Sequence, residues 1–392
     1  MNVWPELKLS DAPFEILDGD RGKNYPSQEE FQSAGHCLFL SAKNVRVDGF
    51  DFGECQFISK EKDAALRKGK LARNDIVLTT RGTVGNVAYY DKKVNYEHVR
   101  INSGMVVIRP DVKSLYPPFN YYIFRSLQGD FQTFASGSAQ PQLPIRDLKE
   151  IEVSIPPLLE QKAIAAVLSN LDDKIDLLYR QNKTLEAMAE TQFRQWFVED
   201  AQEGWDERPL SSIANFLNGL ACQKYPPTND LEKLPILKIR ELSSGISETA
   251  DWATSQVKPG HIVEAGDVIF AWSASLMVKV WDGEKCVLNQ HLFKVTSDEF
   301  PKWFYLRWCK HHLADFIAVA ASHATTMGHI KRGDLDAAMV LVPPPPVLEA
   351  MSKQMQPLLD KQIAIGRQRK TLEKLRDTLL PKLMSGEVRV AV

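Results

Sequence analysis

The sequence lacks the features of several protein classes. Its five cysteines, Cys37, Cys55, Cys222, Cys286 and Cys309, are odd in number and never closely spaced. This pattern argues against a disulfide framework and a zinc site, and it favours a reducing compartment. There is no run of about 18 apolar residues of the kind that predicts a transmembrane helix. The first residues also lack the charged and apolar regions of a secretory signal. We therefore expect a cytoplasmic protein that does not enter a membrane.

Signs of catalysis are equally scarce. The chain has no phosphate-binding loop, no dinucleotide-binding glycine motif and no N/D-P-P-Y/F tetrapeptide of an amino-methyltransferase. A nuclease-like pattern can be drawn through Asp75, Asp91 and Lys93, but the other half of the chain has Glu284 where the lysine should be. The eight histidines do not cluster as ligands. We expect no catalytic residue, no metal site and no cofactor in this chain.

What is present is a globular composition, in a chain of 392 residues that is long enough for two domains. The formal net charge of −2 gives no support to nucleic-acid binding by itself. The charge is uneven, however. Residues 157–205 contain five basic and nine acidic side chains, whereas residues 343–392 contain nine basic and five acidic ones. Opposite charge on two segments favours their association.

These two charged segments share a short sequence motif. The letters K-T-L-E occur at 183–186 and again, 187 residues later, at 370–373. Ordered matches continue back through each half, and the offset drifts to about 200 near the start of each half, as short loop insertions would cause. Examples of the matches are Asp147-Leu148 with Asp334-Leu335, Asn102 with Asn289, and Tyr25-Pro26 with Tyr225-Pro226. The chain is an internal duplication, with a period too long for a solenoid.

Each half follows the same order of predicted structure. Short strand-like runs come first, at 75–80, 105–110, 151–157, 267–272 and 337–344, with helical patches at 119–128 and 301–320. Prolines at 156–157 and 343–346 end the strands. A long helix follows in each half, the first over 161–197 and the second ending at Pro381 and Gly386. We expect four segments: strand-rich domains at 1–156 and 206–342, and helices at 157–205 and 343–392.

Both helices carry a single apolar stripe with a 4-3 spacing, and such a stripe needs a partner. We expect the two helices to pair with each other in a coiled-coil-like, antiparallel arrangement. The alternative is that each helix packs on its own domain. The predicted seam residues are Ile164, Leu168, Leu171, Ile175, Leu178, Leu185, Met351, Met355, Leu358, Ile365, Leu372 and Leu379.

Two polar loops in each half are typical of nucleic-acid contacts. One lies between strands, at 78–86 and 270–278, and the other precedes the last strand, at 135–143 and 321–335. Arginine reads guanine and glutamine reads adenine, while hydroxyl groups bind base edges or phosphates. Simple hairpins and ordinary surface loops are the alternative interpretations. Basic residues also gather at 59–73, and Lys238 and Arg240 alternate along a predicted strand. The candidate DNA contacts are Arg21, Lys23, Lys43, Lys60, Lys68, Lys70, Thr80, Arg81, Thr83, Ser136, Ser138, Gln140, Gln142, Lys224, Lys238, Arg240, Ser273, Ser275, His323, Thr325 and Lys331.

The stretch ASGSAQPQLPIRDLKEIEVSIPPLLEQKAIAAVLSNLDDKIDLLYRQNKTLEAMAETQFRQWFVE at 135–199, together with RKTLEKLRDTLLPKLMSGEVRV at 369–390, resembles the specificity subunit of type I restriction–modification systems. The resemblance implies an α+β fold with pseudo-twofold symmetry, in which two α/β target recognition domains are joined by two spacer helices. It also implies a non-catalytic subunit that reads bipartite double-stranded DNA and uses the helices as a ruler for the gap. The partners implied are two DNA adenine-N6 methyltransferase subunits and ATP-dependent restriction subunits, which would carry S-adenosylmethionine, ATP and Mg²⁺.

The two halves differ where they are expected to meet DNA. Arg81-Gly82 in the first half becomes Ser273-Ala274 in the second, so the predicted target is asymmetric. The start of the second helix is also expected to differ, because LLEQ at 158–161 becomes PPVLEAM in the second half. Two other interpretations stay open. One is a stand-alone nuclease or methyltransferase with degenerate motifs, and the other is a protein-binding scaffold.

Overall fold

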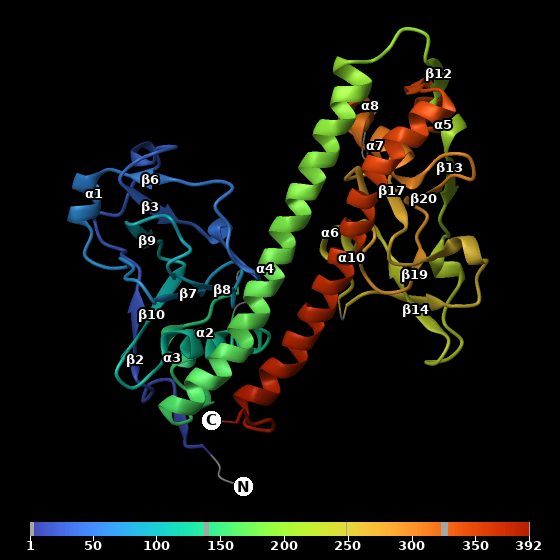
Figure 1. Cartoon of the computed structure of the whole chain (residues 1–392). Coiled ribbons are helices and arrows are strands. Elements are labelled where there is room, and N and C mark those ends of the chain that lie inside the picture. The colour runs from blue at the N-terminus through green and yellow to red at the C-terminus, as the bar shows by residue number, and fades with distance from the viewer. Residues whose placement is uncertain (1–3, 137–140, 248, 323–327, 392) are drawn as a thin grey trace. The chain divides into compact units, whose positions relative to one another are not determined.

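The computed structural model describes residues 4–136, 141–247, 249–322 and 328–391. The chain divides into two compact units: unit 1 consists of residues 1–173 and 374–392, and unit 2 of residues 174–373. Two long helices, α4 (Leu158–Arg194) and α10 (Pro345–Met384), each contribute to both units. They are the light green and red ribbons of Figure 1. None of the helices in the described ranges is long and apolar enough to cross a membrane.

Unit 1 is built on a four-stranded antiparallel sheet. Its strand order is β2 (Phe14–Asp18), β10 (Met105–Pro110), β7 (Ile76–Thr79) and β8 (Val87–Tyr89). A second sheet has the order β6 (Phe57–Ile58), β3 (Cys37–Leu40) and β9 (Val99–Ile101), with β3 and β9 parallel. Two-stranded pairs are formed by β1 (Glu6–Lys8) with β11 (Glu152–Ser154), and by β4 (Val45–Arg46) with β5 (Gly49–Phe50). The helices are α1 (Lys60–Ala65), α2 (Pro117–Ser126) and α3 (Ile145–Leu148).

Unit 2 repeats this plan. Its antiparallel sheet has the order β13 (Asn215–Asn218), β20 (Leu292–Thr296), β17 (Val268–Ala271) and β18 (Met277–Val280). The second sheet has the order β15 (Trp252–Thr254), β14 (Lys233–Leu237), β19 (Cys286–Leu288) and β16 (Ile262–Val263), with β14 and β19 parallel. One pair is formed by β12 (Asp206–Pro209) with β21 (Met339–Val342). The helices are α5 (Leu210–Ile213), α6 (Ile239–Ser244), α7 (Lys302–His311), α8 (Leu313–Ser322) and α9 (Arg332–Ala337).

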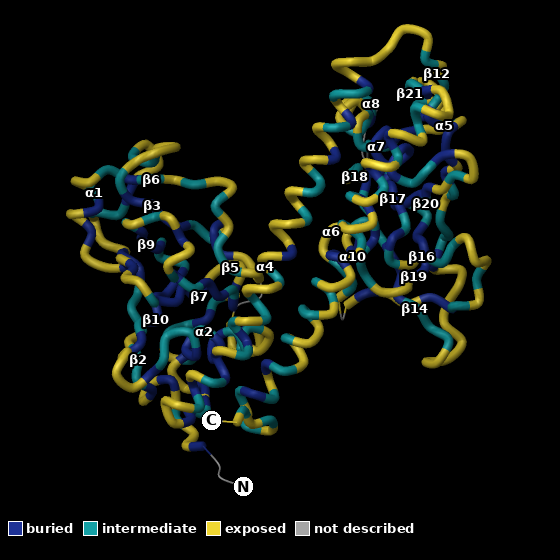
Figure 2. Tube along the Cα trace, in the orientation of Figure 1, coloured by how far each residue is buried: buried dark blue, intermediate teal, exposed yellow. Residues whose placement is uncertain are grey.

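The main sheets of the two units have corresponding strand orders, which confirms the duplication predicted from the sequence. The four strands β2-β10-β7-β8 correspond to β13-β20-β17-β18, and the parallel pair β3-β9 corresponds to β14-β19. Strands β7, β10 and β17 are rich in β-branched residues, and they are almost entirely buried. Figure 2 shows β7 and β17 in dark blue inside their units. Short 3-10 turns occur at Gln28–Glu30, Ala42–Asn44, Asp130–Gln132, Cys222–Lys224 and Pro259–His261, and a π-helical turn at Gln195–Glu199 follows α4.

Each unit has a core that includes both long helices. In unit 1, Leu168 of α4 and Leu380 of α10 belong to the same buried cluster as Phe119 and Ile123 of α2. In unit 2, Phe193 of α4 and Met355 of α10 share a cluster with Trp308 of α7. Burying one such side chain stabilises the fold by about 1.5–3 kcal/mol. In each unit the helices therefore pack both on each other and on a domain. The two arrangements considered from the sequence, helix pairing and packing on a domain, thus occur side by side.

The starts of the two helices differ, as the sequence predicted. Gln161 is 1 % exposed, and its side chain accepts a hydrogen bond from Tyr116 N at 2.8 Å and donates one to Pro156 O at 2.9 Å. In the second half Leu348 stands at the corresponding position and packs against an apolar core. The second helix begins with Pro345 and Pro346, which suit the first turn because the N–H groups there need no helical partner.

The prediction that Pro381 ends the second helix was wrong. Helix α10 passes through Pro381 to Met384, and the left-handed Gly386, with φ of 74°, lies just beyond its end. A proline inside a helix removes one backbone hydrogen bond. Here the neighbouring Leu380 and Leu383 are buried in the core of unit 1, and their packing keeps the last turn in place. The helical patch expected over 301–320 is also divided, because α7 ends at His311 and α8 begins at Leu313.

Candidate nucleic-acid interface

The first polar loop of unit 1 is the turn that joins β7 to β8. Arg81 N donates to Gly104 O at 3.2 Å, and the Thr80 hydroxyl donates to the same carbonyl at 3.1 Å. Gly82 has φ of 75°, a backbone conformation that glycine adopts without steric cost. Thr80 is only 5 % exposed, whereas Arg81 and Thr83 are exposed. The turn is a hairpin, and it presents Arg81 and Thr83 while keeping Thr80 inside.

The second polar loop of unit 1 lies against this turn. Gln142 and Arg81 pair as an isolated β-bridge, and Leu143 N donates to Thr80 O at 2.9 Å. Ser136 and Gln142 exchange backbone hydrogen bonds of 2.8 and 2.9 Å. Arg21 reaches the same region, because its guanidinium donates to Ser103 O at 3.5 Å. The structure thus brings together Arg21, Arg81, Ser136 and Gln142, while Ser138 and Gln140 lie outside the described residues.

Unit 2 has the same two loops in the same relation. Ala274 N donates to Gly328 O at 2.8 Å, and Ser273 pairs with His329 as Arg81 pairs with Gln142. Ala274 has φ of 56° and therefore repeats the left-handed conformation of Gly82. Ser273 is 3 % exposed, whereas Ser275 is exposed. The candidates His323 and Thr325 lie outside the described residues.

In both units a close backbone contact joins the residue after β2 or β13 to the segment that holds Asn102 or Asn289. A Cβ atom on Gly19 would lie 2.3 Å from Asn102 O, and one on Gly219 would lie 2.2 Å from Asn289 O. Neither position tolerates a side chain, because backbone atoms cannot give way. Asn102 and Asn289 are the pair that matched at an offset of 187 in the sequence. The two units therefore hold their polar loops on the same backbone frame.

Sequence reasoning missed an aromatic group in the loops of unit 2. The Trp272 ring stacks on Phe293 with a centroid distance of 5.6 Å and lies 6.1 Å from the His291 ring. Its indole Nε1 donates to Asn218 Oδ1 at 3.3 Å, and Ser273 Oγ lies 3.1 Å from His291 Nδ1. Extending the Asn102–Asn289 match by two residues aligns His291 with Gly104, and this difference would have drawn attention to His291.

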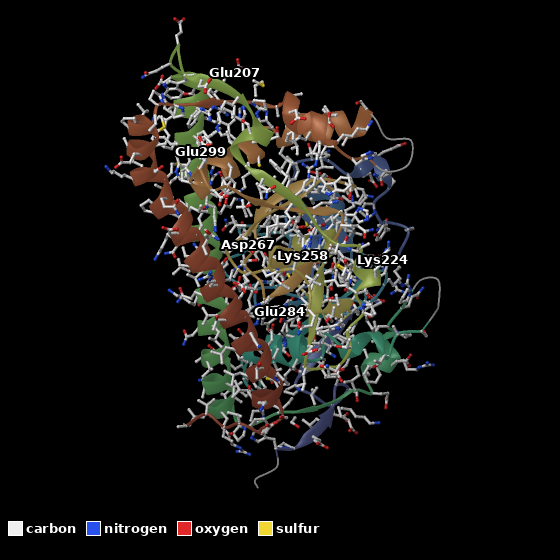
Figure 3. All side chains as sticks on the ribbon, turned by 90° about the vertical axis from the view of Figure 1, so that its right-hand side faces the viewer. Glu207, Lys224, Lys258, Asp267, Glu284 and Glu299 are labelled. Carbon is white, nitrogen blue, oxygen red and sulfur yellow. The ribbon has the colours of Figure 1, made fainter. Side chains whose placement is uncertain are left out.

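The basic candidates are spread over other surfaces. Lys60 and Lys68 are exposed in and after α1, and Lys43 is paired with Glu54 at 3.0 Å. Lys23 and Lys331 are exposed too, and so is Lys224, which is labelled in Figure 3 and ends the turn Cys222–Lys224. Lys70 binds Asp63 at 2.6 Å.

Asp63 gives part of the basic segment 59–73 a structural role, because it binds one of the lysines of that segment. Its carboxylate is 5 % exposed and pairs with Arg100 and Lys70 at 2.5 and 2.6 Å. Burial acts to raise the pKa of the Asp63 carboxyl, but the hydrogen bonds from Lys70 and Arg100 outweigh it and hold the pKa at about 2. Lys70 and Arg100 thus fix the segment around α1.

The prediction of a strand that carries Lys238 and Arg240 was wrong. Strand β14 ends at Leu237, Lys238 caps α6 and pairs with Asp251, and Arg240 lies on α6 next to Glu241, whose carboxylate it binds at 2.8 Å. Strand β14 stops pairing at Leu237, opposite Leu288, and the chain then turns into the short helix. The two cations are therefore not on one face of a sheet.

The nuclease-like pattern also has a structural role. Asp75 is fully buried and accepts two hydrogen bonds from Arg109, at 2.7 and 2.9 Å. Asp91 caps its own turn through Lys93 N at 2.9 Å, and the Lys93 side chain pairs with Asp173 of α4. Within the described ranges no three His, Cys, Asp or Glu side chains are grouped to hold a metal ion.

All twelve predicted seam residues are at least partly buried. Those that are buried are Ile164, Leu168, Leu178, Met351, Met355 and Ile365, and those that are half-buried are Leu171, Ile175, Leu185, Leu358, Leu372 and Leu379. In unit 1 the α10 side chain Arg376 pairs with Asp172 of α4 at 2.9 Å. In unit 2 Gln362 of α10 donates to Glu186 of α4 at 2.9 Å. The ion pair in unit 1 has the sign expected from the opposite charges of the two segments.

The family model described as the type I restriction modification DNA specificity domain matches residues 4–187 and, a second time, residues 202–374. The chain belongs to this family. The two matches confirm the resemblance and the duplicated layout predicted from the sequence. They place the chain among DNA-specificity proteins and disfavour a stand-alone enzyme.

Similar proteins cover most of the chain. The MjaIX type I restriction enzyme specificity subunit of Methanocaldococcus jannaschii is 26 % identical, over 84 % of this chain and 80 % of its own length. The HindI specificity subunit of Haemophilus influenzae is 19 % identical, over 99 % of this chain and all of its own. A crystal structure of a type I restriction–modification S subunit from M. genitalium matches with a TM-score of 0.60 and 17 % identity, over 98 % of this chain and 96 % of the other. This likeness confirms the predicted fold class.

Proposed function

We propose that this chain is the specificity subunit of a type I restriction–modification complex, and that each unit reads one half of an asymmetric, bipartite double-stranded DNA target. The observation that carries the proposal is the pair of equivalent hairpins. Gly82 and Ala274 share a left-handed backbone, with φ of 75° and 56°, yet the residues before them are Arg81 and Ser273. The same hairpin backbone thus presents different side chains in the two units, as the reading of two different half-sites requires.

The loop chemistry supports different readings by the two units. In unit 1 the arginine and glutamine pair, Arg81 and Gln142, offers guanine and adenine contacts. In unit 2 the same places hold Ser273 and His329, beside the Trp272 ring. An aromatic ring stacks on bases without demanding a sequence, and the His329 imidazole hydrogen-bonds to base edges or phosphates. The Ser273 hydroxyl is buried and stays with His291. The exposed lysines at 60, 68, 224 and 331 would neutralise phosphates.

We also propose the partners that the family resemblance implies. Two DNA adenine-N6 methyltransferase subunits would bind the helices, and ATP-dependent restriction subunits would join them; S-adenosylmethionine, ATP and Mg²⁺ would be held by these partners. The repeated K-T-L-E motif supports this arrangement, because it gives the two helices similar exposed surfaces for two identical partners. The exposed side chains at matching positions are Thr184 and Met188 on α4, and Thr371 and Leu375 on α10. The five unpaired cysteines are consistent with work in the cytoplasm.

The division into four segments belongs to the same proposal: recognition domains at 1–156 and 206–342, and spacer helices at 157–205 and 343–392. It is supported by strands that end at Ser154 and Val342, and by helices that begin at Leu158 and Pro345. Exchange of residues 1–155 for the first domain of another family member should change one half-site only. Altered sequence at both halves would contradict the division.

The decisive experiment is to map methylated adenine across the host genome with and without this chain. We expect methylation at one bipartite, asymmetric motif, and its loss when the chain is absent. Methylation that persists without the chain would refute the proposal. An assay of the purified chain alone, with S-adenosylmethionine or with Mg²⁺ and DNA, separates the enzyme alternative, because turnover without partner subunits would support that alternative.

A further inference from the structure

Asp172 of α4 forms a three-way junction in unit 1. Its Oδ2 accepts a hydrogen bond from the Tyr122 hydroxyl of α2 at 2.7 Å, and its Oδ1 pairs with Arg376 of α10 at 2.9 Å. Tyr122 is buried, and burial followed by the nearby Asp172 charge raises the pKa of its hydroxyl, which therefore stays a donor. One carboxylate thus joins the helix of the recognition domain to both long helices.

Glu186 forms the corresponding junction in unit 2. Arg307 of α7 binds both of its oxygens at 2.8 Å, and Lys310 of the same helix lies 2.6 Å away. Gln362 of α10 donates to Oε2 at 2.9 Å. Burial acts to raise the pKa of the Glu186 carboxyl, but the positive charges of Lys310 and Arg307 lower it to about 2. This carboxylate also joins a recognition-domain helix to α4 and α10.

The two junctions share an arrangement of directional bonds, which apolar packing of the helices alone would not require. Each acid lies on α4 and takes donors from equivalent helices, α2 or α7, and from α10. A bidentate arginine pair is directional, because the planar guanidinium fits a carboxylate in a fixed fork. Rotation of α7 on α4 would break several charge-assisted bonds at once, whereas apolar contacts alone tolerate small rotations. The segment of α4 from 172 to 186 contains no proline or glycine, the residues at which helices usually kink.

We infer that Asp172 and Glu186 are positioning residues, which fix the orientation of each recognition domain on the helix pair and so set how strictly the complex discriminates gap length. The inference rests on the proposed function, and it assigns to these two residues a part in specificity that involves no contact with DNA. Half-site sequence is then decided in the loops, gap length by the length of the helices, and the strictness with which that gap is required by the junctions.

The test uses the full chain assembled with its methyltransferase subunit. Duplexes carry the mapped half-sites with the native gap, or with a gap one base pair shorter or longer. In Glu186→Gln and Asp172→Asn we expect the ratio of methylation rates, native gap over altered gap, to fall about tenfold, the factor that corresponds to 1.4 kcal/mol. Duplexes with one changed base in a half-site should be discriminated as in the unaltered complex.

Two matched controls lie on the same helix. Glu190→Gln and Asp176→Asn make the same chemical changes at exposed positions of α4, and they should keep the strict gap. Tyr122→Phe and Gln362→Met remove single donors to the two carboxylates, and they should relax the gap by a smaller factor. These milder variants decide the matter if the charge variants fail to assemble.

The outcomes separate the two proposals. An unchanged gap ratio in the assembled complexes of Glu186→Gln and Tyr122→Phe would overturn the inference, and so would an equal fall in the two control variants. A lower rate on every duplex with an unchanged ratio would mean that the junctions only stabilise the fold. If the unaltered complex methylates no specific sequence, the proposed function itself fails.

Discussion

The Oγ atom of Ser273 lies 3.1 Å from Nδ1 of His291, and this pair occupies the place that Arg81 and Gly104 hold in unit 1. Around both pairs the backbone is the same: a glycine presses against an asparagine carbonyl, and a left-handed residue turns the hairpin. The duplicated frame was kept while the side chains it presents diverged. Changes at these positions should therefore act on one half-site at a time.

Arg81→Lys should weaken recognition of the first half-site and leave the second unchanged. A lysine keeps the positive charge but loses the fork that binds guanine through two hydrogen bonds, a contact that gives about 1–3 kcal/mol of discrimination. Methylation of duplexes with single-base changes in each half-site measures the effect. Arg46→Lys, at another exposed arginine of unit 1, is the control and should change neither half-site.

His291→Ala should alter the second half-site alone. It removes the imidazole that faces Trp272 and leaves the buried Ser273 hydroxyl without its partner. Adenine methylation mapping should then show a relaxed or changed second half-site. His311→Ala, at an exposed histidine of the same unit, should keep the original motif. A change in the first half-site in His291→Ala would contradict the assignment of one half-site to each unit.

One heptad inserted into both α4, after Asp173, and α10, after Glu373, should lengthen the gap and keep both half-sites. Seven helical residues add about 10.5 Å at 1.5 Å per residue, and this rise corresponds to roughly three base pairs at about 3.4 Å each. Lengthening both helices keeps their apolar stripes in register. The recognised motif is read again by methylation mapping, and an unchanged gap would refute the role of the helices as a ruler.

Asp63→Asn should destabilise unit 1. It leaves the buried guanidinium of Arg100 without its counter-charge, and loss of one member of a buried ion pair typically costs about 3–5 kcal/mol. Urea unfolding followed by circular dichroism measures the free energy of unfolding. Glu54→Gln breaks the exposed pair with Lys43 and should cost at most about 1 kcal/mol. Equal costs in the two variants would show that the Asp63 network contributes little.

Glu186 should make stability depend on pH in the acid range. Its folded pKa of about 2 lies below the ordinary value of 4.5, so its contribution is complete above about pH 4.5 and is lost as the pH falls toward 2. The difference in unfolding free energy between the unaltered chain and Glu186→Gln should therefore be larger at pH 7 than at pH 3. A difference that is constant with pH would mean that Glu186 has an ordinary pKa in the folded chain.

Much of the architecture follows from local patterns. Runs of β-branched residues and the apolar stripe along 161–197 predicted strands and a long helix, because these patterns reflect contacts that each segment must bury. Errors occurred where distant contacts decided the outcome. Pro381 stays helical because Leu380 and Leu383 are held in the core of unit 1, and the strand expected through Lys238 ends where its pairing with β19 ends. Propensity rules do not include these partners.

The sequence by itself determined the duplication, the alternation of domain and helix, and the family. Ordered residue matches show the duplication and the family, and the spacing of apolar residues shows where strands give way to a helix. Only the tertiary structure decided which polar residues meet. It brought Arg81 to Gln142, and Ser273 to His329, across long stretches of chain, and it turned Thr80 and Ser273 inward. It also gathered the donors of Glu186, which lies on α4, from two other helices, α7 and α10. Such encounters depend on how distant segments pack, and no local pattern in the chain encodes them.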